Sequence, residues 1–200
     1  MRPRSFAVFA VLAALALPAT AVARIRLAGE FVMSGRITAA HGVRGEHVGE
    51  RVTRTWDFLA PCPAGQCRTE NLMRSRAKGM DKVKLHRKRR MHGHWTGQGS
   101  FFAPLRCGAR VYPRGERVYF RIKVRITGAT IVDGILAATT VKASYTSTRR
   151  TNRTRCVGAL GHDAATYTGK LVTPAPAPTP APVPTPTPTP VPPGPTPAPY

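Results

Sequence analysis

Apolar and polar side chains alternate along most of the chain after its first two dozen residues. The clearest stretch is residues 117–127, in which apolar side chains from Val118 to Ile126 alternate with charged or aromatic ones. A period of two indicates half-buried β-strands rather than helices. Similar stretches occur at residues 31–39, 52–60, 68–78, 82–88, 91–101, 135–145 and 165–171. We therefore predict about eight strands and no amphipathic helix after the N-terminal segment.

The strands at residues 117–127 and 135–145 are predicted to form a hairpin, with Gly128 to Gly134 as its connection. Sequential antiparallel strands with one polar face suit an up-and-down barrel or, alternatively, a two-sheet sandwich. We predict an all-β fold with a single antiparallel domain closed as an up-and-down barrel. The strand number and order resemble those of secreted small-ligand barrels of the calycin type, in architecture alone.

The N-terminal segment has the three parts of a secretory signal peptide. Arg2 and Arg4 precede an apolar stretch from Phe6 to Leu17, and small residues ending at Ala23 follow. This order predicts export and cleavage after Ala23. A helix of this apolar length spans about 18 Å, against a hydrocarbon layer of roughly 30 Å, so the segment is not expected to remain as a transmembrane anchor.

The C-terminal segment from Pro174 to Tyr200 has proline at about every second position and carries no charge. Proline fixes φ and removes a backbone donor, so this segment is predicted to be a disordered, extended spacer of polyproline II type. The predicted organisation is a signal peptide at 1–23, a basic β-domain at 24–173 and a proline-rich tail at 174–200.

The four cysteines all follow the signal peptide, and an even number in an exported chain predicts two disulfides. The short separation between the first two favours a local pair, which leaves the other two to close a long loop. The predicted bridges are Cys62–Cys67 and Cys107–Cys156. A zinc site is the alternative, but no Cys-x2-Cys knuckle is present.

The formal net charge of the chain is +22, which becomes +20 without the two arginines of the signal peptide. Such a charge attracts polyanions. Arginine exceeds lysine, and Ala, Gly and Pro are abundant, as in products of GC-rich bacterial genes. This compositional bias weakens the argument that each arginine was selected for binding.

Two stretches concentrate positive charge on predicted strands, at residues 82–90 and 117–125. In the second, residues two apart point the same way and form a stripe about 27 Å long at roughly 3.3 Å per residue. Tyr119 lies within this stripe and is expected to be available for stacking. A solvated basic surface is the alternative interpretation. The predicted polyanion-binding residues are Lys82, Lys84, Arg87, Lys88, Arg89, Arg90, Arg117, Tyr119, Arg121, Lys123 and Arg125.

The sequence contains no recognisable catalytic or metal-binding motif. His92 and His94 have the spacing that places two imidazoles on one face of a strand, but no acid or cysteine nearby completes a ligand set. Ser100 lacks the glycines of a nucleophile elbow, and the acids are scattered. We therefore expect no metal, no cofactor and no enzymatic activity.

The sequence favours a secreted, non-catalytic binding module, extracellular or associated with the cell envelope. Its expected partner is an anionic polymer, such as an envelope polymer, an acidic polysaccharide or extracellular nucleic acid. A small-ligand carrier is one alternative, and its cavity lining would be Trp56, Trp95, Tyr145 and Tyr167. An inhibitor of a secreted enzyme is another.

Overall fold

The computed structural model describes residues 25–43, 45–62, 67–76, 79–89, 91, 93–155 and 160–176 of the chain. The predicted signal peptide and nearly all of the predicted tail lie outside these residues. The described residues form eight β-strands and no helix. The strands are β1 (Gly29–His41), β2 (Arg51–Leu59), β3 (Thr69–Ser75), β4 (Met80–Arg87), β5 (His94–Cys107), β6 (Arg110–Val132), β7 (Ile135–Asn152) and β8 (His162–Pro174).

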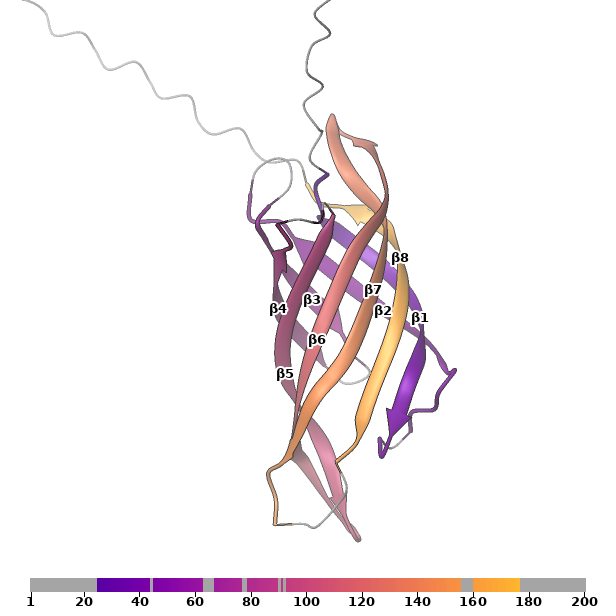
Figure 1. The fold of residues 1–200 in the computed structure, drawn as a ribbon, viewed down its shortest axis with the longest axis vertical. Helices are drawn as coiled ribbons and strands as arrows, with labels where there is room; N and C mark the ends of the chain where they lie inside the picture. The colour runs from indigo at the N-terminus through magenta and orange to yellow at the C-terminus, as the bar shows by residue number, and fades with distance from the viewer. Residues whose placement is uncertain are drawn as a thin grey trace, which may run out of the picture.

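Each strand pairs antiparallel with the next strand in the sequence, and β8 returns to pair with β1. The result is one closed sheet in up-and-down order, with the strands tilted around a common axis (Figure 1). Closure leaves no free edge along the middle of the sheet. The prediction of an up-and-down barrel is confirmed, and the sandwich alternative is wrong.

The period of two seen in the sequence separates the interior of the barrel from its exterior. In β6 the apolar side chains from Val118 to Val124 are buried, whereas Arg121, Lys123 and Arg125 are exposed. The same alternation runs along β1, β2, β4 and β8. The interior is therefore filled by one face of every strand, as expected for a small barrel.

The connection between β6 and β7 is shorter than predicted. β6 continues past Gly128 to Val132, and the turn consists of Asp133 and Gly134 alone, with φ of 49° and 75°. Positive φ at both positions is the geometry of a tight hairpin turn, which Asp-Gly favours. Gly128 instead marks a β-bulge, where the register with β7 shifts near Thr140. The prediction of a turn from Gly128 to Gly134 is therefore wrong.

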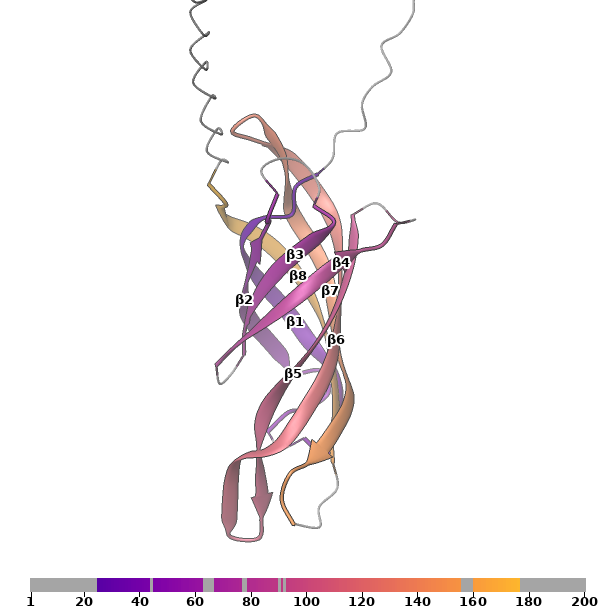
Figure 2. The same ribbon diagram turned by 90° about the vertical axis from the view of Figure 1, so that its left-hand side faces the viewer.

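The barrel is elongated, and a hairpin extends beyond it at each end (Figures 1 and 2). At one end lie the β6–β7 turn, the end of β8 and the N-terminal segment, in which Arg26 bridges to Ala137 and Leu27 is fully buried. We call this end the terminal pole. At the other end the β5–β6 hairpin extends beside the end of β7. We call residues 98–119 and 148–155 the arginine pole.

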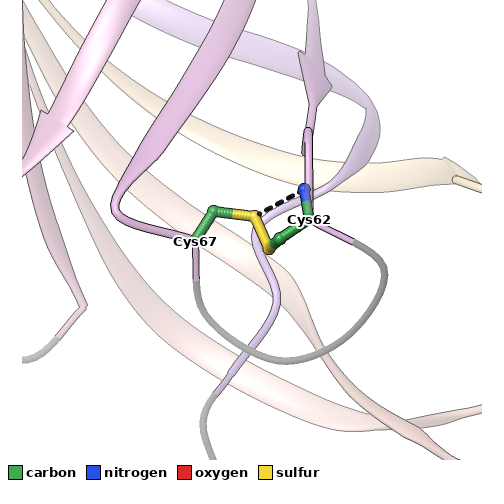
Figure 3. The surroundings of a disulfide bond; sticks show 2 residues. All are labelled: Cys62 and Cys67. Carbon is green, nitrogen blue, oxygen red and sulfur yellow. Dashed lines mark hydrogen bonds between the residues drawn. A yellow bond between two sulfur atoms is a disulfide. The ribbon is translucent and has the colours of Figure 1, made fainter.

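The predicted local disulfide joins Cys62 to Cys67, with the two Cα atoms 5.7 Å apart. It connects the segment after β2 to the segment before β3, and the Cys62 backbone N–H donates a hydrogen bond of 3.3 Å to the Cys67 sulfur (Figure 3). Cys107, at the end of β5, is also disulfide-bonded. Its predicted partner, Cys156, lies outside the described residues.

The described part of the chain holds no helix with the length and hydropathy that crossing a bilayer requires.

Candidate polyanion interface

The first predicted basic stretch lies on β4 and in the turn that follows it. Arg87 is half-buried there, and Arg90 lies outside the described residues. The exposed members are Lys82, Lys84, Lys88 and Arg89. Because Val83 and Leu85 point into the barrel, the lysines between and beside them face outward.

The second predicted stretch forms the outer face of β6, and β5 lies between it and β4. Thr96 of β5 pairs with His86 on one side and Lys123 on the other. Adjacent strands are about 4.8 Å apart, so the outward side chains of β4 and β6 are roughly 10 Å from each other across β5. The fold therefore brings the two predicted clusters onto one side of the barrel.

A shallow groove of about 990 Å³ crosses the outer surface from β6 over β7, β8 and β1 to β2. Lys123 and Arg125 form its β6 wall, and Lys142 lies opposite Arg125 on β7. Arg36 and Arg51 face each other at its far side, on β1 and β2. The serines and threonines of its lining are Ser34, Thr53, Ser144, Thr166 and Thr168. We call this surface the basic groove.

The basic groove combines five cations with hydroxyl groups, and none of its lining residues is acidic. His94 also lines it. Partial burial, together with the charges of Arg125 and Lys88, lowers the pKa of His94, so the imidazole is neutral near pH 7. The groove thus offers a ligand positively charged guanidinium and ammonium groups together with neutral hydroxyl and imidazole groups.

Three of the five cations in the basic groove were not predicted as binding residues. None of them, Arg36, Arg51 or Lys142, is next to another lysine or arginine in the sequence. They come together only because β1 pairs with both β2 and β8, and β7 pairs with both β6 and β8. A search for runs of positive charge along the sequence cannot detect a surface whose cations come from different strands.

Four of the nine acidic residues are buried. One of them, Asp81 of β4, accepts hydrogen bonds from Arg74 at 2.6 Å and from Arg76 at 2.8 Å. The Arg74 guanidinium also lies 4.5 Å from the ring centroid of Phe120 and 4.7 Å from that of Tyr145. Charge pairing and ring contacts together stabilise the buried charge of Arg74, although its Nε has no hydrogen-bond partner among the described residues.

Two further buried acids are paired with one arginine. Arg150 of β7 donates to Glu116 of β6 at 3.1 Å and to Asp163 of β8, and the side chains of all three are at most 10% exposed. Burial alone lowers the pKa of Arg150, but its hydrogen bond to Asp163 and the charges of Asp163 and Glu116 raise it above the ordinary value. The cluster ties β6, β7 and β8 together.

The fourth buried acid, Glu70 of β3, is fully buried, and neither of its carboxylate oxygens has a hydrogen-bond partner among the described residues. Burial raises the pKa of Glu70 to about 8, although the charge of Arg26 opposes the shift. Glu70 is therefore mainly protonated at neutral pH.

Arginines and aromatic rings alternate on the surface of the arginine pole. The guanidinium carbons of Arg117 and Arg149 lie 4.9 Å and 4.4 Å from the ring centroid of Tyr119. Those of Arg114 and Arg153 lie 4.2 Å and 5.1 Å from that of Phe102. Two guanidinium groups therefore already lie against the ring of Tyr119, the residue that the sequence predicts to be available for stacking.

The paired histidines show no metal site within the described residues. His92 lies outside the described residues, and His94 is in the basic groove. No three His, Cys, Asp or Glu side chains gather as a metal site requires in the part of the chain that the structure describes.

The four aromatic residues named for the carrier hypothesis all lie in the hydrophobic core. Trp56 and Trp95 are at most 1% exposed. Trp56 packs on Tyr167 with 5.4 Å between ring centroids, and Tyr145 packs on Phe120 at 5.6 Å. Rings at these separations are in contact. This packing favours an interior filled by side chains over a chamber for a ligand.

The fold and surface together define a class of molecule: an up-and-down β-barrel with buried acids and a basic exterior. Comparison of the chain with protein-family models, with curated proteins and with solved structures finds no match.

Proposed function

We propose that the chain is an exported, non-catalytic binding module that holds anionic polymers on the basic exterior of its barrel. The charge of the molecule is divided between its inside and its outside. Three of the four buried acids are paired with arginines and the fourth, Glu70, is mainly protonated, whereas most of the described lysines and arginines are exposed. Such a surface attracts and retains polymers of opposite charge.

The observation that carries this proposal is the burial of Glu70, Asp81, Glu116 and Asp163 inside the barrel. Acids on the outside would pair with neighbouring cations and compete with an anionic ligand. In the described residues the exposed acids are only Glu30, Glu50 and Asp133, and none lines the basic groove. The cations of the groove therefore have no protein carboxylate within the lining to neutralise them.

Export is supported by the predicted signal peptide and by the disulfide between Cys62 and Cys67. Disulfides persist in oxidising compartments and are rare in the cytosol of mesophiles. Envelope polymers, acidic polysaccharides and extracellular nucleic acids are all anionic, and all are met outside the cytoplasm.

Neutralising three groove cations with Lys123→Gln, Arg125→Gln and Lys142→Gln is expected to weaken binding to heparin and to DNA by about ten- to a hundredfold. Each lost contact also lowers the slope of log affinity against log salt by about one. The measurement is fluorescence anisotropy between about 50 and 200 mM salt, repeated with the wild-type chain.

The matched control is Lys82→Gln, Lys84→Gln and Lys88→Gln, which removes the same charge from β4 and its following turn. We expect a smaller loss from this variant, since these side chains lie outside the basic groove. Equal losses would show that the groove is not a preferred contact. Wild-type binding that does not weaken with salt would rule out the proposed function.

A further inference from the structure

The arginine pole carries two recesses on its surface, separate from the basic groove. One, of about 430 Å³, is lined by Gln98, Ser100, Tyr119, Thr148 and Arg149, with parts of Gly99 and Phe120. We call it the Tyr119 recess. The other, of about 480 Å³, lies around Phe102, Tyr112, Arg114 and Arg153. Each is large enough for a planar ring of the size of a nucleobase.

The guanidinium groups beside these recesses lie over aromatic rings, and that of Arg117 is also hydrogen-bonded. Arg149 lies 4.4 Å from the centroid of the Tyr119 ring. Arg117 lies over the same ring and donates from Nε and Nη2 to the Ser100 hydroxyl, at 3.3 Å and 3.2 Å. A guanidinium that rests on a ring presents its outer face for stacking and its N–H edge for phosphate.

The Tyr119 recess also contains groups that a simple charge contact does not need. Gln98 has an amide, and Ser100 and Thr148 have hydroxyls, all of which both donate and accept hydrogen bonds. A sulfated or uronic polymer has anionic groups and hydroxyls but no aromatic plane, whereas an unstacked base offers both a planar face and a mixed donor and acceptor edge. This combination matches single-stranded nucleic acid better than an acidic polysaccharide.

We propose that the arginine pole binds single-stranded nucleic acid, with one base in the Tyr119 recess stacked on the Arg149 guanidinium. The phosphates on either side contact neighbouring arginines of the pole. Tyr119 is then a positioning residue, since it supports Arg149 and does not itself stack on the base. This inference rests on the proposed function and names the class of polymer.

The test compares a fluorescein-labelled oligothymidylate with an abasic oligodeoxynucleotide of the same length and charge. The wild-type chain is expected to bind the oligothymidylate about 5- to 50-fold more tightly, from the stacking of the base. Arg149→Lys keeps the charge but loses the planar face, so it is expected to bind both probes with nearly equal affinity. Tyr119→Leu is expected to act in the same way, and Tyr119→Phe to retain the preference.

The control is Arg68→Lys, because Arg68 is an exposed arginine outside the Tyr119 recess and the arginine pole. It is expected to leave the preference unchanged. Equal wild-type affinity for the two probes overturns the nucleic-acid proposal, and tighter binding to heparin that Arg149→Lys leaves unchanged assigns the pole to polysaccharide instead. Failure of all three probes to bind at low salt overturns the proposed function itself. Circular dichroism of each variant verifies that the barrel is folded.

Discussion

Replacing Arg150 by methionine is expected to lower the free energy of unfolding by about 3–5 kcal/mol at neutral pH, since it removes the one cation shared by two buried carboxylates. Methionine fills much of the same space but leaves Glu116 and Asp163 without their charge partner. The measurement is urea denaturation at neutral pH. The loss is expected to shrink as the pH falls, because protonation removes the two uncompensated negative charges.

Two further variants separate the charge effect from packing. Arg121→Met makes the same substitution at an exposed position, where a change within about 0.5 kcal/mol is expected. The triple variant Arg150→Met, Glu116→Gln and Asp163→Asn removes all the charges together and is expected to recover much of the stability. A loss below about 1 kcal/mol for Arg150→Met alone would contradict the structural role given to this cluster.

Substituting glutamine for Glu70 is expected to stabilise the protein at alkaline pH and to change little at acid pH. The folded state holds a proton on Glu70 up to a pKa of about 8, whereas the unfolded chain releases it near 4.5. The wild-type chain therefore loses stability as the pH rises through this window, and the loss is complete above about pH 8. Glutamine has the same shape and remains neutral, so this part of the loss disappears.

The gap in unfolding free energy between Glu70→Gln and the wild-type chain is expected to grow from near zero at about pH 4.5 to roughly 2–5 kcal/mol above pH 8. Thermal and urea denaturation near pH 5 and near pH 9 measure it. Glu30→Gln, at an exposed position of β1, serves as the control and is expected to show no such growth. A gap of constant size across the pH range would mean that Glu70 is ionised in the folded barrel.

The fold could be predicted from the sequence because β-strand periodicity is local. The alternation from Val118 to Val124 identifies a buried face without reference to any other strand. The short separation of Cys62 and Cys67 identifies their bridge in the same way. Asp133 and Gly134 also carry a local hairpin signal, but Gly128 upstream is equally typical of a turn and in the structure marks a bulge.

The candidate site could be predicted only in part, because strand pairing creates it. Lys123 and Arg125 belong to an obvious charged strand, but Arg36 and Arg51 join them only through the register of four other pairings. The acids are scattered along the sequence, and strand pairing brings some of them together in the same way. Their burial depends on which face of each strand turns inward and on arginines such as Arg150 that reach them from neighbouring strands.

Both ends of the described chain lie at the same pole of the barrel, which affects how copies attached to a surface are oriented. Arg26, Pro174 and Ala175 line the same small depression, so both ends depart from the terminal pole. Coupling the protein to a bead or a cell surface through either end therefore leaves the arginine pole outermost (Figures 1 and 2). A dense layer of such copies would expose many arginine poles side by side. Its avidity for a long anionic polymer would rise with surface coverage, because one polymer molecule can contact several poles at once.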